Sequence, residues 1–507
     1  MARYSSPGVY VEEVSGGVKP IAGVGTSTGA FVGLAEKGDI GKAKLITNWS
    51  QYVKEFGSFI PNGYLAYAVY AFLAEGGTSC YVVRASSDKA KSSHVTIKDS
   101  GGGGAAANVL TVTARSEGKW GDRVTIVIGD PSEKPKETHF KLTINYKEKE
   151  TFKEEFEGEV SEVFDNISSA NIEDTINNVS GFIKMHADAT DKRPANDSYP
   201  LTGGEDGIED ADFTGTSDNK KGLHAFDEID DINIVAIPDK YGDREVILAG
   251  LNYCKDRKDC FFIADPPYGI SPTDSTKGGV KEFKNGTTDT YKGNAFNSSC
   301  GALYYPWLWV SDPLTGGKRL IPPSGLVAGK YAYTDATRGV HKAPAGISEG
   351  YLGTAVGIER IVTRGEHDVL HPLGINVIRS FPTSGICIWG ASTLSADPEW
   401  KYVNVRRLLL YIEESIDEGS QWVVFEPNDP GLWGKVIRNV TAFLLRVWRD
   451  GALFGSTPEE AFYVKVDAEN NPPEERDAGY LHIEVGVAPV KPAEFVVIQI
   501  KQKTQTK

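Results

Sequence analysis

Two parts of the chain combine residue types that bind metals or phosphates in other proteins. His367 and His371 have the i, i+4 spacing of a helical metal-binding pair, but Pro372 disfavours helix at residue 371. We therefore interpret both as loop histidines. Residues 23–29, GVGTSTG, look like a phosphate-binding loop, yet they lack the Gly-Lys-Ser/Thr of a P-loop. They also precede a β-forming stretch, so no helix N-terminus would meet a phosphate.

A third candidate is Asp265, which follows an apolar run at residues 260–264 and precedes two prolines. Ligands of α/β proteins often bind where such strands end, but a structural turn is our preferred interpretation. The chain has no GxSxG elbow and no acid–histidine metalloprotease pattern. We therefore predict no catalytic, cofactor-binding or metal site. An α/β enzyme with a β-rich insertion remains an alternative, because sequence cannot show which carboxylates folding brings together.

Composition restricts the possible partners. The 507 residues are 40% hydrophobic with a net charge of −15, which indicates a multidomain globular protein. No segment is basic enough to follow a phosphate backbone, so we expect no nucleic-acid partner. No signal peptide or membrane-spanning stretch is visible. The five scattered cysteines predict buried, reduced thiols in a protein made in the cytoplasm.

The elements predict an α/β (α+β) multidomain fold. Strands alternate with helices in two regions, which favours a largely parallel sheet. The predicted elements are strands 28–34, 80–84, 232–237, 260–264 and 302–310, and helices 64–73 and 243–254. Between these regions, a glycine run at 101–104 introduces short predicted strands at 109–113, 124–128 and 140–146, and helices at 159–167 and 172–179. Residues 321–345 contain too many glycines and prolines for a regular element.

These patterns predict a discontinuous main domain with two insertions. Its N-terminal part is 1–90 and its C-terminal part is 340–507. Residues 91–205 would form a β-rich outer domain, and 206–339 a second inserted α/β domain.

Two helices are predicted near the C-terminus. The first follows Asp397 and closes at Gly419. In the second, Asp429 caps, Pro430 starts the helix and Gly451 follows its end. Its cations lie away from its apolar stripe: Lys435, Arg438, Arg446 and Arg449. A solvated basic face is the ordinary interpretation of such a pattern.

Both ends of the chain carry strand-forming residues beside a polar tail. A terminal strand can pair within its own subunit or with the open sheet edge of a neighbour. The residues are Val9, Tyr10, Val11, Glu12, Glu13 and Val14 at one end, and Phe495, Val496, Val497, Ile498, Gln499 and Ile500 at the other.

Four blocks in order give the chain a family resemblance. They are residues 371–416 (beginning HPLGINVIRSFPTSG), WVVFEPNDPGLW at 422–433, WRDGALFGSTPEEAFYVKVD at 448–467 and VGVAPVKPAEFVVIQI at 485–500. Together they resemble contractile tail sheath proteins, which wrap the tube of contractile phages and phage-like injection particles. Ser392 and Thr383 stand where that pattern usually has arginine and glycine, respectively.

The resemblance implies a many-copy sheath around an inner tube protein, bounded by baseplate and tail-terminator or cap proteins. It implies contraction that drives the tube through an envelope without a cofactor and without membrane insertion of the subunit. It also implies exchanged terminal arms and a C-terminal helix at the tube, to which Lys435, Arg438, Arg446 and Arg449 would belong. The particle would be a virion tail or a phage-like assembly. A non-contractile shell or adhesin protein is a further alternative.

Overall fold

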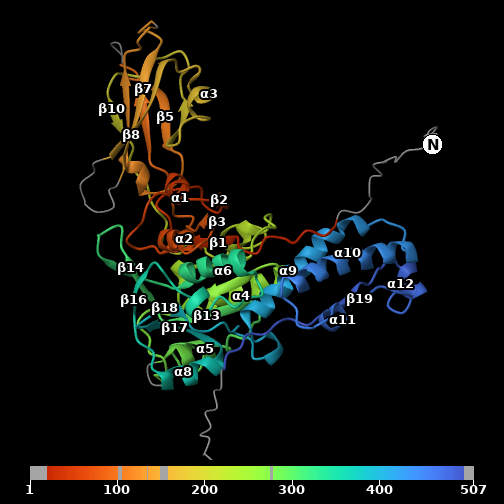
Figure 1. Cartoon of the computed structure of the whole chain (residues 1–507). Coiled ribbons are helices and arrows are strands. Elements are labelled where there is room, and N and C mark those ends of the chain that lie inside the picture. Colours follow the sequence, from red (N-terminus) through yellow and green to blue (C-terminus); the bar gives the residue numbers. More distant parts are fainter. Residues whose placement is uncertain (1–19, 101–105, 134, 149–157, 275–277, 496–507) are drawn as a thin grey trace, which may run out of the picture. The chain divides into compact units, whose positions relative to one another are not determined.

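The computed structural model describes residues 20–495 except 101–105, 134, 149–157 and 275–277. It divides into two compact units (Figure 1). The larger unit comprises Gly25–Arg407 and Lys491–Lys507, and the smaller comprises Met1–Val24 and Leu408–Val490.

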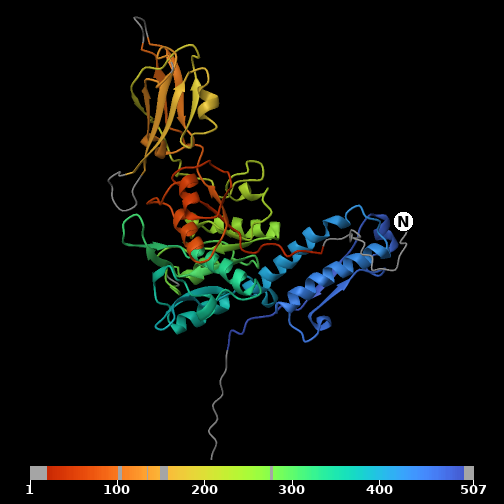
Figure 2. The ribbon, with the colours of Figure 1, turned by 45° about the horizontal axis from the view of Figure 1, so that its top comes forward.

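An eight-stranded sheet runs through the larger unit (Figure 2). Its six central strands are parallel, and one antiparallel strand closes each edge. The order is β18 (Gly385–Ile388), β17 (Ile375–Phe381), β13 (Gly301–Tyr305), β12 (Phe261–Ala264), β11 (Ile234–Ala236), β1 (Gly29–Gly33), β3 (Cys80–Arg84) and β2 (Lys44–Ile46). Residues 206–339 thus supply the middle of this sheet, and the expected second inserted domain is corrected. Sequence spacing did not reveal this, because strand partners are chosen by long-range packing.

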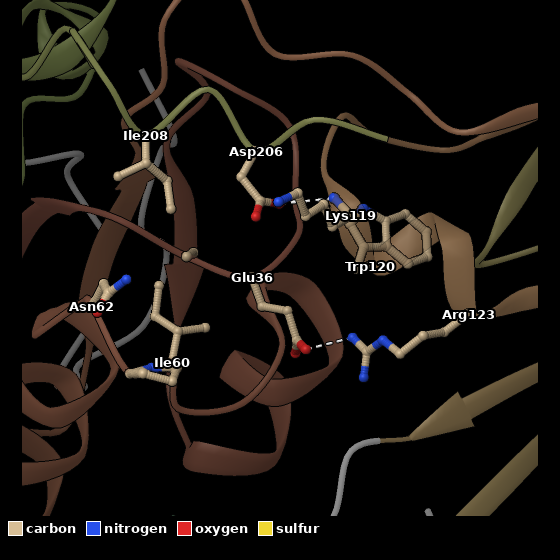
Figure 3. Close-up of a pocket in the computed structure, with 10 residues that line it drawn as sticks. Glu36, Ile60, Asn62, Lys119, Trp120, Arg123, Asp206 and Ile208 are labelled. Carbon is tan, nitrogen blue, oxygen red and sulfur yellow. Dashed lines mark hydrogen bonds and ion pairs between the residues drawn. The ribbon is translucent and has the colours of Figure 1, made fainter. Parts of the chain in front are cut away.

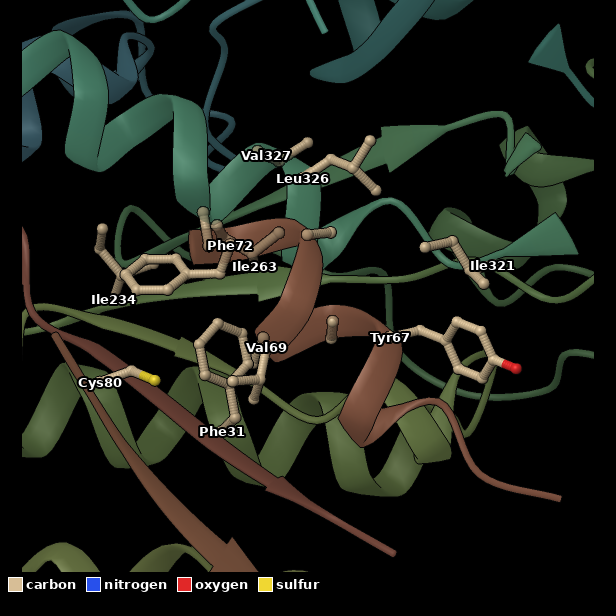
Figure 4. Close-up of a cluster of buried hydrophobic side chains, with 14 of the residues drawn as sticks. Phe31, Tyr67, Val69, Phe72, Cys80, Ile234, Ile263, Ile321, Leu326 and Val327 are labelled. Carbon is tan, nitrogen blue, oxygen red and sulfur yellow. The ribbon is translucent and has the colours of Figure 1, made fainter. Parts of the chain in front are cut away.

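The sheet is covered on both faces, as its apolar strands require. In β1, Phe31 joins one hydrophobic cluster, while Ala30 and Val32 join another, since successive side chains point to opposite faces. Helices α2 (Leu65–Ala74) and α6 (Ser324–Arg338) contribute to the Phe31 cluster, part of which Figure 4 shows. Helices α4 (Arg244–Arg257) and α5 (Val280–Asn285) contribute to the other.

Helix α6 corrects the expectation that residues 321–345 lack regular structure. Its glycines serve close packing against α2, because a Cβ at Gly325 would stand 2.5 Å from the Cα of Ala68. A Cβ at Gly329 would stand 2.7 Å from the carbonyl oxygen of Phe72. The glycines that argued against a helix are therefore what allows two helices to touch.

Residues 91–205 are rich in strand and have a hydrophobic cluster of their own. A four-stranded sheet has the order β10 (Ser198–Pro200), β6 (Val124–Gly129), β7 (Phe140–Glu148) and β8 (Gly158–Ile167), and a three-stranded sheet has the order β4 (His94–Lys98), β5 (Asn108–Ala114) and β9 (Ile183–Ala187). Strand β8 corrects the helix expected at 159–167. Its apolar residues have helical spacing, but antiparallel pairing with β7, including a register shift between Phe140 and Leu142, determines the structure. The predicted helix at 172–179 is the short α3 (Ile172–Ile176).

The remaining elements of the larger unit are short. They are α1 (Trp49–Phe56), α7 (Gly346–Glu349), α8 (Arg364–Leu370) and a sheet of β15 (Lys318–Ile321), β14 (Leu308–Ser311) and β16 (Ala355–Ile358). All five cysteines are buried and free, as predicted.

The smaller unit contains most of one long helix, the whole of a second and a small sheet. Helix α9 (Val403–Ser420) begins in the larger unit and continues into the smaller one. A 3-10 turn, Pro398–Trp400, precedes it, so Asp397 caps that turn and not α9 itself. The other elements are α10 (Pro430–Arg449), α11 (Pro458–Ala461), β19 (Phe462–Lys465), α12 (Pro473–Asp477) and β20 (Glu484–Val487).

Candidate functional site

Helix α10 begins and ends close to where its local sequence predicts. The Asp429 side chain accepts a hydrogen bond from the backbone N–H of Leu432 at 2.8 Å, and Pro430 occupies the first turn. Gly451, just beyond the last helical residue, has φ +82°, a conformation that glycine adopts at low cost. One face is buried: Leu432, Trp433, Val436, Val440, Phe443, Leu444 and Val447.

The opposite face of α10 is basic and exposed. Lys435, Arg438, Arg446 and Arg449 are all exposed. None of the four forms an ion pair with a carboxylate among the residues that the structure describes; Arg438 donates to the backbone oxygen of Gly434 at 3.2 Å. Lys435, Arg438 and Arg449 lie on the same side of the helix. Their positive charges are therefore available to a binding partner.

Arg446 differs from the other three. Its guanidinium donates to the backbone carbonyl of Ile21, a residue only 2% exposed. In the same segment, the Val24 N–H donates to Ser415 Oγ at 3.1 Å, and Gly23 lies against Tyr411. Arg446 therefore helps to hold residues 20–24 against α9 and α10. The sequence does not reveal this role, because Arg446 and Ile21 are 425 positions apart.

Strands β19 and β20 form a two-stranded antiparallel sheet in the smaller unit. Phe462 is paired with Val487 and Lys465 with Glu484. Within the described part of the chain, no third strand joins either edge. A two-stranded sheet is marginal by itself, and open edges are where further strands add.

Most of the predicted arm residues lie outside the described ranges. This holds for Val9 to Val14 and for Val496 to Ile500. Of the predicted arms, only Phe495 is described, and it is 77% exposed.

The carboxyl edge of the parallel sheet is occupied by the chain's own groups. Between the ends of β1 and β11, where α/β folds commonly bind ligands, Asp239 accepts from the N–H of Leu34 at 2.6 Å and from that of Tyr64. After β12, Asp265 accepts from the Ser324 N–H at 2.9 Å. Burial raises the pKa of Asp239 to about 6 and that of Asp265 to about 7. Both carboxylates thus accept hydrogen bonds from backbone N–H groups at this edge of the sheet.

His367 and His371 are helical, so the loop interpretation is wrong. His367 lies on α8 and His371 begins the following 3-10 turn, in which Pro372 is tolerated near the start. Their rings are 5.8 Å apart between centroids. No group of three or more potential metal ligands is found among the described residues.

A cavity of about 350 Å³ is lined by residues 35–36 and 60–62, by residues 119–120 and 123 of the β-rich region, and by Asp206 and Ile208 (Figure 3). Glu36 forms an ion pair with Arg123, and Asp206 accepts from the backbone N–H of Lys119 at 2.8 Å. Two of the carboxylates that line the cavity thus already have partners within the protein.

Next to this cavity, the Lys37 ammonium lies 5.4–5.9 Å from the ring centroids of Trp120, Tyr146 and Phe182. Arg84, only 1% exposed, donates to the backbone oxygens of Gly38 and Glu117. No sequence signal points to these groups, because neither Glu36-Lys37 nor Arg84-Ala85 belongs to a recognisable motif.

The C-terminal part of the chain is similar to a known protein family. Residues 395–503 match the family model of the phage tail sheath C-terminal domain. The tail sheath protein of Vibrio phage KVP40 is 25% identical over 48% of this chain and 36% of its own length. That of Burkholderia phage BcepMu is 32% identical over 37% of this chain and 40% of its own length. The chain thus spans less than half of these curated relatives.

Solved structures match nearly the whole fold. The contracted sheath of the extracellular contractile injection system PVC superposes with a TM-score of 0.59 at 21% identity, over 99% of both chains. A sheath tail protein of Listeria innocua gives a TM-score of 0.60 at 14% identity, over 89% of this chain and 90% of its own. The fold of this chain is therefore that of contractile sheath proteins. No helix in the described residues is long and apolar enough to cross a bilayer.

Proposed function

We propose that this protein is a structural subunit of a contractile sheath, because residues 395–503 match the phage tail sheath C-terminal domain and the chain has the fold of sheath proteins. Many copies polymerise around an inner tube, and contraction drives that tube through a target envelope. The observation that carries the proposal is the fold match over 99% of the chain to a sheath in its contracted state. The work comes from re-packing of subunits in a lattice, so the reaction needs no cofactor and no catalytic residue.

Exchanged terminal arms join the copies. Residues 9–14 and 495–500 form the arms, and the open edges of β19 and β20 are their docking places. Edge addition suits this task, because backbone hydrogen bonds can form along a strand whatever its exposed side chains are. Two added strands would also complete a sheet that is marginal with two strands alone.

The basic face of α10 contacts the tube. Lys435, Arg438 and Arg449 have no carboxylate partner among the described residues, so an acidic tube surface would pair them without breaking an existing ion pair. Each exposed pair contributes only about 0.2–1 kcal/mol, but the contribution recurs in every subunit. Arg446 is less available for tube contact, because its guanidinium already donates a hydrogen bond to the Ile21 carbonyl.

The wider assembly follows from the same proposal. Baseplate and terminator or cap proteins bound the sheath, and the β-rich residues 91–205 form its outer layer. The subunit is made in the cytoplasm and works in a virion tail or phage-like particle, without nucleic-acid binding or membrane insertion. The enzyme alternative gains no support from the sheet edge, where Asp239 and Asp265 cap the chain's own backbone.

Negative-stain electron microscopy of the purified chain, alone and with its tube protein, tests the proposal. A sheath subunit should give long hollow helical polymers, wider when empty than when they enclose a tube. Closed shells or persistent monomers in the presence of the tube protein would instead favour the shell or adhesin alternative.

A further inference from the structure

The last described residues of the chain, 491–495, are held mainly through the side chain of Glu494. The Glu494 side chain is only 15% exposed, whereas Phe495 beside it is 77% exposed. Residues 491–495 belong to the larger unit, as do His371, Lys401 and Tyr402, so the anchor lies within that unit.

Three side chains from two separate segments surround the Glu494 carboxylate. Lys401 Nζ lies 2.8 Å from Oε2, and the Tyr402 hydroxyl donates to the same oxygen at 3.1 Å. His371 Nε2, from the turn before β17, lies 3.5 Å away. The His371 ring also meets the Phe495 ring edge-on, with the centroids 6.0 Å apart.

The charges around Glu494 also stabilise its carboxylate in this position. Burial raises the pKa of Glu494, but the hydrogen bond from Lys401 and the neighbouring His371 lower it more, and the pKa ends below its usual value. The carboxylate therefore stays ionised at neutral pH. It is charged, largely buried and paired, so removing Lys401 would leave a carboxylate that is costly to keep in place.

An ordinary surface ion pair does not have these properties. Lys89 and Asp210 are equally close, at 2.8 Å, but their side chains are 65% and 79% exposed. Such a pair contributes little, since water competes for both charges. It serves as a matched control because it has the same length and the same charges.

We propose that Glu494, Lys401, Tyr402 and His371 form a clamp that fixes where the C-terminal segment leaves the larger unit and so aims this segment at a second copy of the chain. Glu494 acts as a positioning residue: the clamp sets the starting point and direction of the arm, while the arm itself makes the inter-subunit contact. The local part of this inference stands alone, and the aiming of the arm rests on the proposed sheath function.

The local part is tested on the isolated monomer by hydrogen–deuterium exchange. Glu494→Lys places two cations together, and we expect amide exchange in a peptide covering 491–495 to become about threefold to tenfold faster. Exchange in α6 should not change. The swap Lys401→Glu with Glu494→Lys restores the opposite charges and should return the exchange rate part of the way to that of the unmodified chain, while Asp210→Lys should leave this peptide unchanged. Unaltered exchange in the Glu494→Lys monomer would refute the clamp.

The aiming of the arm is tested by assembly of the same variants. Glu494→Lys should melt within about 2 °C of the unmodified chain, since the lost contact holds only the terminal segment, yet form fewer and shorter polymers. The charge swap should lengthen them again. Faster exchange combined with normal polymers would overturn the aiming role while leaving the clamp intact. If the unmodified chain forms no polymer, the proposed function fails, and the exchange result still decides the clamp.

Discussion

Gly325 in α6 lies so close to Ala68 in α2 that a Cβ built at residue 325 would stand 2.5 Å from the Ala68 Cα atom. The obstructing atoms include backbone, which cannot turn aside as a flexible side chain would. The two helices pack over one face of the central sheet, so any separation between them also disturbs the cluster that includes Phe31 and Phe72. A substitution that adds a Cβ at Gly325 therefore tests this packing directly.

Gly325→Ala should destabilise the larger unit by about 1–3 kcal/mol, the usual cost of overpacking a filled interior. Gly365→Ala is the matched control, because residue 365 is also helical and a Cβ there meets nothing within 4 Å. The control should be neutral or slightly stabilising, since alanine favours helix over glycine. Thermal unfolding of the two variants measures the difference, and equal melting temperatures would contradict the close packing.

Asp265→Asn should change how stability depends on pH. The folded-state pKa of Asp265 is about 7, above its value of about 4 in an unfolded chain, so the folded state binds the proton more tightly. The contribution of Asp265 to stability is therefore largest below about pH 4 and declines as pH rises towards 7. Asparagine cannot ionise, and its side-chain oxygen can still accept from the Ser324 N–H.

We expect the melting temperature of Asp265→Asn, relative to the unmodified chain, to rise between pH 5 and pH 8. The exposed Asp210→Asn should give a flat difference over this range, because its pKa lies below the usual value, lowered by its hydrogen bond with Lys89. A constant offset for Asp265→Asn would mean that this carboxyl is already ionised in the folded protein at pH 5.

Reversing charge on the exposed face of α10 should weaken tube binding and spare the monomer. Lys435→Glu with Arg438→Glu removes no contact to the buried face, so the monomer should melt as before. Sheath–tube complexes should become fewer, most clearly at low salt, where screening is weakest. Electron microscopy across a salt series measures this, with Lys98→Glu plus Lys184→Glu as a control of equal charge change on exposed side chains.

Arg446→Glu should behave differently from that pair. It loses the hydrogen bond to the Ile21 carbonyl and should lower the monomer melting temperature as well. Normal extended particles from Lys435→Glu with Arg438→Glu, with an unchanged salt response, would assign this face to solvent.

Deleting residues 1–14 should leave a folded monomer that does not polymerise. The deletion leaves Ile21 and Val24 in place, and these anchor the N-terminal segment to the smaller unit. Deleting 501–507 is the control, because that tail lies beyond the predicted C-terminal arm. Circular dichroism melting and sedimentation measure folding and assembly. Long polymers from the truncated chain would exclude arm exchange at this end. Loss of cooperative melting would instead show that residues 1–14 pair within their own subunit.

Local signals predicted some elements well. Asp429 and Pro430 define the start of α10 through groups within three residues, so sequence was sufficient there. It was insufficient for α6, whose glycines are explained only by α2, and for Arg446, whose partner is 425 positions away. It also failed for β8, where a helical spacing of apolar residues was overruled by pairing with β7. The same holds for the candidate site. The basic face of α10 could be predicted from the sequence, whereas the partners of Arg446 and Glu494 could be identified only from the structure.

The place of β1 between β3 and β11 has a consequence for how the chain is made. β11 follows β1 by about two hundred residues, as the hydrogen bond from Thr28 to Asn233 records with a separation of 205. During synthesis, the β-rich residues 91–205, with a hydrophobic cluster of their own, emerge before β1 can meet that partner. Domains of growing chains tend to fold in order of emergence, and long-range strand pairing is slow. The β-rich residues 91–205 can therefore fold before the central sheet, which cannot be completed until β17 and β18 have also emerged.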